Sequence, residues 1–109
     1  MNILIIGCET MGEHLSNHLA RLGHDVAVVD RNEENFDRLD DDFSGYTVEG
    51  VPIDQEVLKR AGIAGCYVLV AASPDDNTNV MVSQLAKEIF EVPRVITHIY
   101  DPQRREAFS

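Results

Sequence analysis

Two glycines five positions apart follow the first apolar segment of the chain. The segment GCETMG, residues 7–12, comes directly after the apolar run 2–6 and directly before an apolar pattern with helical spacing. A strand, a glycine turn and a helix start in this order form a cradle for a nucleotide phosphate. The reason is that a helix N-terminus offers unpaired N–H groups and the positive end of the helix dipole. The sequence therefore predicts a phosphate-binding loop over residues 7–12.

An acidic side chain, Asp30, ends the next apolar run, 18 residues past Gly12. An acid at the tip of the second strand is where a dinucleotide-binding fold holds the ribose hydroxyls. A carboxylate there favours NAD over NADP, because NADP would bring a 2′-phosphate against it. Arg31 follows directly and can accommodate such a phosphate, which weakens the preference.

The middle position of the glycine loop departs from the usual G-x-G-x-x-G pattern, because Glu9 stands there. A glycine at this position lets the backbone touch the pyrophosphate, whereas Glu9 adds bulk and a negative charge. Two unit charges about 4–5 Å apart repel by roughly 1 kcal/mol in a water-like dielectric and by about 4 at an effective value near 20. We therefore expect weak binding of NAD and a relative preference for ligands with less phosphate charge, such as AMP. The alternative is a cation that bridges Glu9 to the phosphates.

Two further segments carry small or polar residues at expected strand ends. Ala71, Ala72 and Ser73 follow the fourth apolar run and would let a ligand approach closely; Asn79 is expected to reach back toward the glycine loop. The run 73–79 can also be read as a capped helix start. The third strand is followed by Gly50 and Val51. The residues expected to lie around a bound nucleotide are Gly7, Cys8, Glu9, Thr10, Met11, Gly12, Asp30, Arg31, Gly50, Val51, Ala71, Ala72, Ser73 and Asn79.

The elements that would position these residues alternate along the whole chain. Strands are expected at 2–6, 25–29, 46–49, 66–71 and 94–99, and helices at 11–22, 33–39, 54–61 and 75–90, with a further helix from Pro102. This alternation predicts an α/β, Rossmann-like, doubly wound parallel sheet with strand order 3-2-1-4-5. Ligands of such sheets bind at the carboxyl ends of the strands, at the switch point between the first and fourth strands. The apolar residues expected to face the sheet from the first and last complete helices are Met11, Leu15, Leu19, Leu22, Met81, Val82, Leu85, Ala86 and Ile89.

Composition narrows the possible functions. A chain of 109 residues is long enough for one domain with its own core. Its net charge of −10 disfavours nucleic acid and anionic lipid as partners. No apolar run has the length of a membrane span and no leader pattern is present, so we expect a cytoplasmic protein without direct membrane insertion. Cys8 and Cys66 are expected as free thiols at opposite ends of the sheet. No catalytic residue and no metal ligand can be assigned.

Several motifs together resemble the RCK or KTN family, also called the TrkA N-terminal domain. They are the G-x-x-x-x-G loop, the strand end V-V-D, the segment LKRAGI at 58–63 and the run SPDDNTN at 73–79. The resemblance implies a non-enzymatic regulatory domain that binds NAD(H) or an adenine nucleotide (AMP, ADP or ATP). It also implies a membrane-embedded potassium channel or transporter subunit as partner, at the inner face of the membrane, and gating of potassium transport by the ligand. Val51 stands where the family usually has an acid near the adenine.

The resemblance further implies that residues 1–109 are one nucleotide-binding domain of a longer chain, cut in its crossover helix. The full-length protein would form homo-oligomers through a swapped helix and a sixth strand, both beyond Ser109. Two other hypotheses stay open at this point. One is the cofactor-binding domain of an NAD-dependent dehydrogenase, which would need a second domain with a catalytic base. The other is a degenerate domain kept only as an assembly surface.

Overall fold

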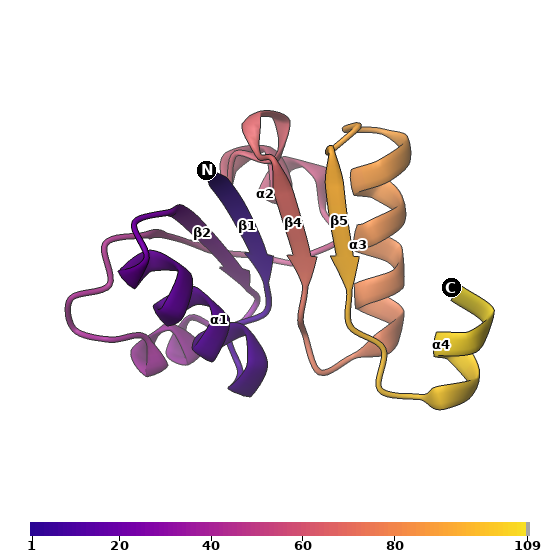
Figure 1. The fold of residues 1–109 in the computed structure, drawn as a ribbon, viewed down its shortest axis with the longest axis horizontal. Helices are drawn as coiled ribbons and strands as arrows, with labels where there is room; N and C mark the ends of the chain where they lie inside the picture. Colours follow the sequence, from indigo (N-terminus) through magenta and orange to yellow (C-terminus); the bar gives the residue numbers. More distant parts are fainter. Residues whose placement is uncertain (109) are drawn as a thin grey trace.

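Strand β1 (Asn2–Ile6) lies at the centre of a five-stranded parallel sheet in the computed structural model, which describes residues 1–108 (Figure 1). Residues 3–6 are all buried, because both faces of the sheet are covered there. The other strands are β2 (Asp25–Asp30), β3 (Tyr46–Glu49), β4 (Val68–Ala71) and β5 (Arg94–Thr97). The observed order β3-β2-β1-β4-β5 and the parallel pairing confirm the predicted Rossmann-like topology.

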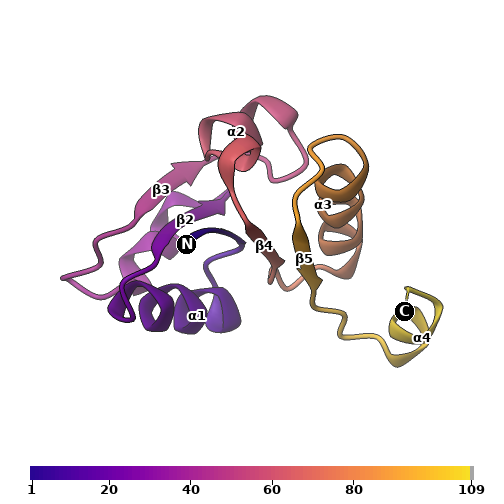
Figure 2. The same cartoon turned by 45° about the horizontal axis from the view of Figure 1, so that its top comes forward.

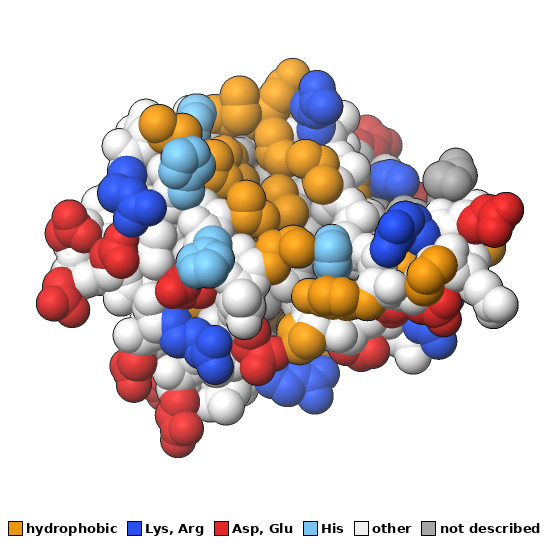
Figure 3. All heavy atoms as spheres, turned by 60° about the horizontal axis from the view of Figure 1, so that its bottom comes forward, with side chains coloured by type: hydrophobic (Ala, Val, Ile, Leu, Met, Phe, Trp, Pro, Cys, Tyr) orange, Lys and Arg blue, Asp and Glu red, His pale blue; other side chains and the backbone are white. Residues whose placement is uncertain are grey.

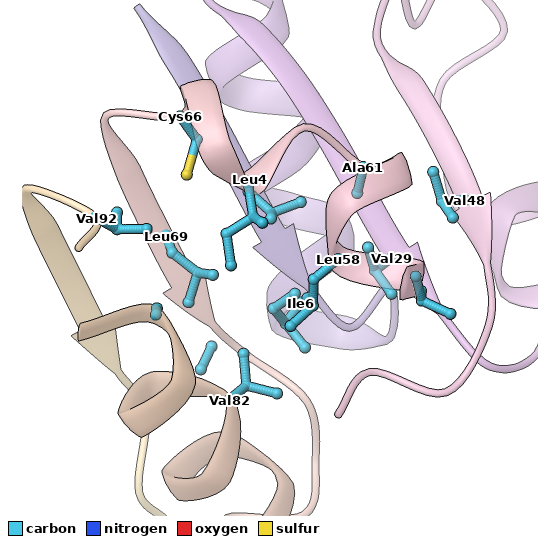
Figure 4. Packing of buried hydrophobic residues seen from close by; sticks show 14 residues of the cluster. Leu4, Ile6, Val29, Val48, Leu58, Ala61, Cys66, Leu69, Val82 and Val92 are labelled. Atoms are coloured by element: carbon cyan, nitrogen blue, oxygen red, sulfur yellow. The ribbon is translucent and has the colours of Figure 1, made fainter. Parts of the chain in front are cut away.

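Helices cover the sheet from both sides (Figures 1 and 2). Helix α1 (Thr10–Arg21) and the 3₁₀ helix η1 (Glu33–Arg38) contribute to one core cluster. Helices α2 (Gln55–Arg60) and α3 (Asp76–Glu88), with the short 3₁₀ turn η2 (Ile63–Gly65), contribute to the other. Figure 4 shows this second cluster, in which side chains of α2 and α3 meet the sheet.

The element boundaries differ from the sequence prediction by one or two residues at several places, and helix α3 ends at Glu88 rather than at residue 90. The segment after Asn32 forms a 3₁₀ helix, although Phe36 and Leu39 face the core as expected. The fourth strand begins at Val68, because Cys66 closes the turn η2. The fifth strand ends at Thr97, two residues earlier than expected.

Three residues assigned to inward stripes are exposed, so that part of the prediction is wrong. Leu22 is 61% exposed, Met81 47% and Ile89 54%. Leu22 and Ile89 follow the last residue of their helices, where the chain leaves the sheet surface. The remaining stripe residues pack against the two clusters as expected.

Helix α4 (Pro102–Phe108) lies beyond the edge strand β5 and covers neither face of the sheet (Figures 1 and 2). The α1 face next to β4 and β5 is therefore open, and Ile96 is 50% exposed there. Figure 3 shows apolar side chains gathered on one face of the molecule. Among the described residues, no helix is both long and apolar enough to cross a membrane.

Candidate functional site

Three strands end at the same level and bring the predicted site residues to one edge of the sheet. Ile6 of β1 is paired with Val29 of β2 and with Ala71 of β4. The Gly7 amide donates a hydrogen bond to the Val29 carbonyl at 2.7 Å. The glycine loop, the tip of β2 and the segment after β4 therefore meet at the switch point of the sheet, as predicted.

Close packing explains both glycines of the loop. Gly7 has a φ of +100°, and a Cβ atom there would lie 2.7 Å from the Cα of Ser73. A Cβ atom on Gly12 would lie 1.7 Å from the carbonyl oxygen of Gly7. The two glycines thus let helix α1 and the segment after β4 close tightly on the loop.

Glu9 is the N-cap residue of α1, and its backbone is in an extended conformation (φ −94°, ψ −160°) that any residue adopts. Its side chain makes no capping hydrogen bond and is half-buried. The loop conformation therefore does not require a glycine at this position. What the Glu9 side chain changes is the space and the charge beside the loop.

Asp30 is 6% exposed and anchors the glycine loop to the tip of β2. Its Oδ2 accepts a hydrogen bond from the Cys8 amide at 2.8 Å. Its Oδ1 accepts one from the Asn32 amide at 2.8 Å and one from Asn35 Nδ2 at 3.1 Å. A carboxylate accepts about four hydrogen bonds, so these three protein donors leave one acceptor site of Asp30 unused.

A cavity of about 360 Å³ lies at this edge of the sheet. It brings together three carboxylates, on Glu9, Asp30 and Asp75, and one basic side chain, Arg31. The lining residues are Gly7, Glu9, Asp30, Arg31, Asn32, Asn35, Pro52, Ser73, Pro74, Asp75 and Thr78.

A smaller cavity of about 180 Å³ adjoins the first and shares Glu9 and Pro74 with it. Its remaining lining residues are Thr10, Met11, Arg38, Ala72 and Tyr100. Glu9 therefore lines both cavities, and Arg31 lines one of them and Arg38 the other.

Eight of the fourteen predicted site residues line one or both cavities: Gly7, Glu9, Thr10, Met11, Asp30, Arg31, Ala72 and Ser73. The other six line neither: Cys8, Gly12, Gly50, Val51, Ala71 and Asn79. After β3, the cavity is lined by Pro52, while Val51 is 45% exposed.

Asn79 is fully buried and fixes backbone groups around the cavity. Its Oδ1 accepts from the Ser73 amide at 3.0 Å, and its Nδ2 donates to the carbonyls of Ser73 (2.8 Å) and His98 (2.9 Å). These hydrogen bonds join the segment after β4 to the end of β5. None of them reaches the glycine loop. The prediction that the Asn79 side chain reaches back toward that loop is therefore wrong.

Two titratable groups near the cavity have shifted pKa values. The Thr78 hydroxyl donates to Asp75 at 2.7 Å and lowers the pKa of that carboxyl. Burial raises the pKa of the Cys8 thiol to about 12, and the nearby Asp30 carboxylate adds to the effect. At neutral pH the cavity therefore carries a charged Asp75, and Cys8 is a protonated thiol without nucleophilic character.

Larger hollows lie elsewhere on the surface, and one of about 400 Å³ beside the end of α1 is lined by neither Gly7 nor Asp30. Two others are larger still. One, of about 590 Å³, is at the amino ends of β1 and β2, and the other, of about 1020 Å³, runs along α1. Neither of them is lined by Gly7 or Asp30. Within residues 1–108, no three His, Cys, Asp or Glu side chains are grouped to hold a metal ion.

Several lining residues were missed by the sequence analysis. Pro74, Asp75 and Thr78 lie in the run 73–79 that had been singled out, so the signal for them was present. Asn32, Asn35 and Arg38 depend on how η1 packs beside the loop, and their residue types alone do not reveal this position.

The fold and the site define a class: a Rossmann-like domain with a glycine loop and an acidic second-strand tip at the switch point. The family model of the TrkA-N domain matches residues 3–109, and the chain belongs to this family. It is 41% identical over its full length to the Trk system potassium uptake protein TrkA of Streptomyces coelicolor. The chain spans 49% of that relative, about half its length.

Solved structures agree on the fold. The carboxy-terminal domain of Kef from Shewanella denitrificans, in an AMP-bound form, superposes with a TM-score of 0.82 at 18% identity, over 99% of this chain and 64% of that one. The NAD(P)-binding domain of an exopolyphosphatase-related protein from Archaeoglobus fulgidus gives a TM-score of 0.79 at 23% identity. That match covers 97% of this chain and 78% of the other.

Proposed function

We propose that this domain binds an adenine nucleotide, without chemical conversion, and so regulates a potassium uptake system. The observation that carries the proposal is the 360 Å³ cavity, where the glycine loop and Asp30 meet. The relative from Streptomyces is named a Trk system potassium uptake protein, and the Kef neighbour was solved with AMP. The domain would act in the cytoplasm, in a homo-oligomer attached to a membrane-embedded transporter subunit.

The cavity favours a mononucleotide such as AMP over intact NAD. Its volume is at the low end of the about 300–1,000 Å³ typical of ligand pockets. Asp30 retains one acceptor site for a ribose hydroxyl. The Glu9 carboxylate repels additional phosphate groups. NAD(H), ADP and ATP, which carry more phosphate charge than AMP, are therefore the weaker candidates.

The start of α3 offers a route from the cavity to the end of the chain. Asp75 and Thr78 line the cavity, and Asp76 between them accepts hydrogen bonds from the amides of Tyr100 (2.7 Å) and Asp101 (3.0 Å). A ligand that moves this turn would therefore also move the segment that leads into α4. We propose this coupling as the way in which ligand state reaches the transporter.

Thermal unfolding in the presence of AMP, ADP, ATP, NAD and NADH tests nucleotide binding. A ligand that binds only the folded state raises the unfolding midpoint by mass action. We expect the largest shift with AMP, and the same shift in the control Arg60→Ala, which changes the distant hollow at the amino ends of the strands. If none of the five ligands shifts the midpoint at millimolar concentration, the proposal is wrong.

A further inference from the structure

We propose that Arg38, which the family motifs do not include, contacts the phosphate of the bound nucleotide and distinguishes AMP from adenosine. This inference rests on the proposed function and names a residue that determines its specificity. Arg38 is the last residue of η1 and lines the 180 Å³ cavity with Glu9, Thr10 and Met11.

Arg38 lines the same cavity as the glycine-loop residues Glu9, Thr10 and Met11. Its positive charge lowers the pKa of the Cys8 thiol and so opposes the larger effects of burial and of Asp30. Cys8 directly follows Gly7, so the charge acts at the loop itself. Arg38 therefore supplies positive charge at the loop from an element outside it.

Arg38 has no carboxylate partner among the described residues. Ion pairs within residues 1–108 join His14 to Glu13, Arg21 to Asp40 and Lys59 to Glu56, and none of these three involves Arg38. Glu9 and Arg38 line the same small cavity without forming one. A guanidinium in this state keeps its donors for a ligand, and its planar fork matches phosphate geometry.

The two adjoining cavities define the orientation in which the nucleotide binds. Asp30 is on the wall of the 360 Å³ cavity, which places the nucleoside there, and Arg38 is on the wall of the 180 Å³ cavity, which places the phosphate there. The two cavities meet at Glu9 and Pro74. Arg38 thus offsets the charge of Glu9 where the phosphate passes it, and a single phosphate fits this arrangement better than a longer chain.

Calorimetric titration with AMP and with adenosine tests the assignment in the wild type, Arg38→Ala and Arg38→Lys. We expect Arg38→Ala to weaken AMP binding about tenfold or more, because a charge-assisted contact is lost. Adenosine binding should not change, which also shows that the variant is folded. Arg38→Lys should recover part of the AMP affinity. Arg60→Ala, an exposed arginine at the end of α2, is the matched control and should leave both affinities unchanged.

Two results would overturn the role of Arg38 while leaving nucleotide binding intact. One is unchanged AMP affinity in Arg38→Ala, and the other is an equal loss of AMP and adenosine affinity. Absence of binding of both ligands to the wild type is a different result, because it overturns the proposed function itself and the role of Arg38 with it.

Discussion

Glu9 is the residue that separates this loop from a standard dinucleotide-binding loop. Its backbone conformation suits any residue, it lines both cavities, and its side chain makes no capping hydrogen bond. We therefore expect Glu9 to affect ligand binding rather than folding. Gly7 and Gly12 are the opposite case. A side chain at either position would collide with the protein itself, so these two glycines are needed for folding.

Replacement of Glu9 by glycine is expected to strengthen NAD binding more than AMP binding. Removing one charge beside the phosphates changes affinity by about fivefold to several hundredfold, depending on the local dielectric. Calorimetry of the wild type and Glu9→Gly with NAD and AMP, with and without magnesium, measures the effect. Micromolar NAD binding to the wild type without metal, unchanged in Glu9→Gly, would contradict this prediction.

The start of helix α3 combines a cap with a charged carboxylate. Asp75 accepts hydrogen bonds from the Asn77 amide and the Thr78 hydroxyl, and its pKa is lowered mainly by the latter. A carboxyl whose pKa is lower in the folded state stabilises the protein above its unfolded pKa, near 3.8, and this stabilisation is lost as the pH falls through the folded value.

Replacement of Asp75 by asparagine is therefore expected to make the free energy of unfolding decrease less as the pH falls. Asparagine keeps the capping oxygen but does not titrate. Denaturant unfolding between pH 6 and about pH 3 should show a smaller decline for Asp75→Asn than for the wild type. Asp37→Asn, at an exposed position in η1, serves as the control. A decline as steep as that of the wild type would show that Asp75 does not contribute to the acid sensitivity.

Most of the elements could be predicted from the sequence, because continuous apolar runs and glycine stops mark strands that are covered on both faces. The meeting of Gly7, Asp30 and Ser73 follows from the parallel register and was also predictable. The hydrogen bonds from η1 to Asp30 and the position of Arg38 were not, because they depend on a 3₁₀ turn with no periodic signature.

The whole molecule exposes an apolar area on the α1 face beside β4 and β5, where α4 does not cover the sheet (Figures 2 and 3). Ile96, which is paired with Val70 of β4, is half-exposed there. We expect residues 1–109 to be monomeric at micromolar concentration and to associate weakly above it.

Light scattering over a concentration series tests this expectation. Ile96→Asn should reduce the weak association, whereas Met81→Asn, which changes an exposed residue of α3, should not. A stable octamer of residues 1–109 at micromolar concentration would refute the expectation.

The central claim is that an adenine nucleotide occupies the carboxyl edge of the sheet, and chemical-shift mapping of the ¹⁵N-labelled protein with AMP tests it most directly. The account predicts that the amide signals that shift belong to residues 7–13, 30–38 and 73–78, around the two cavities. Shifts confined to residues 25–27, 44–46 and 60–66, around the hollow at the opposite edge, would contradict it, as would no shift at all at millimolar AMP.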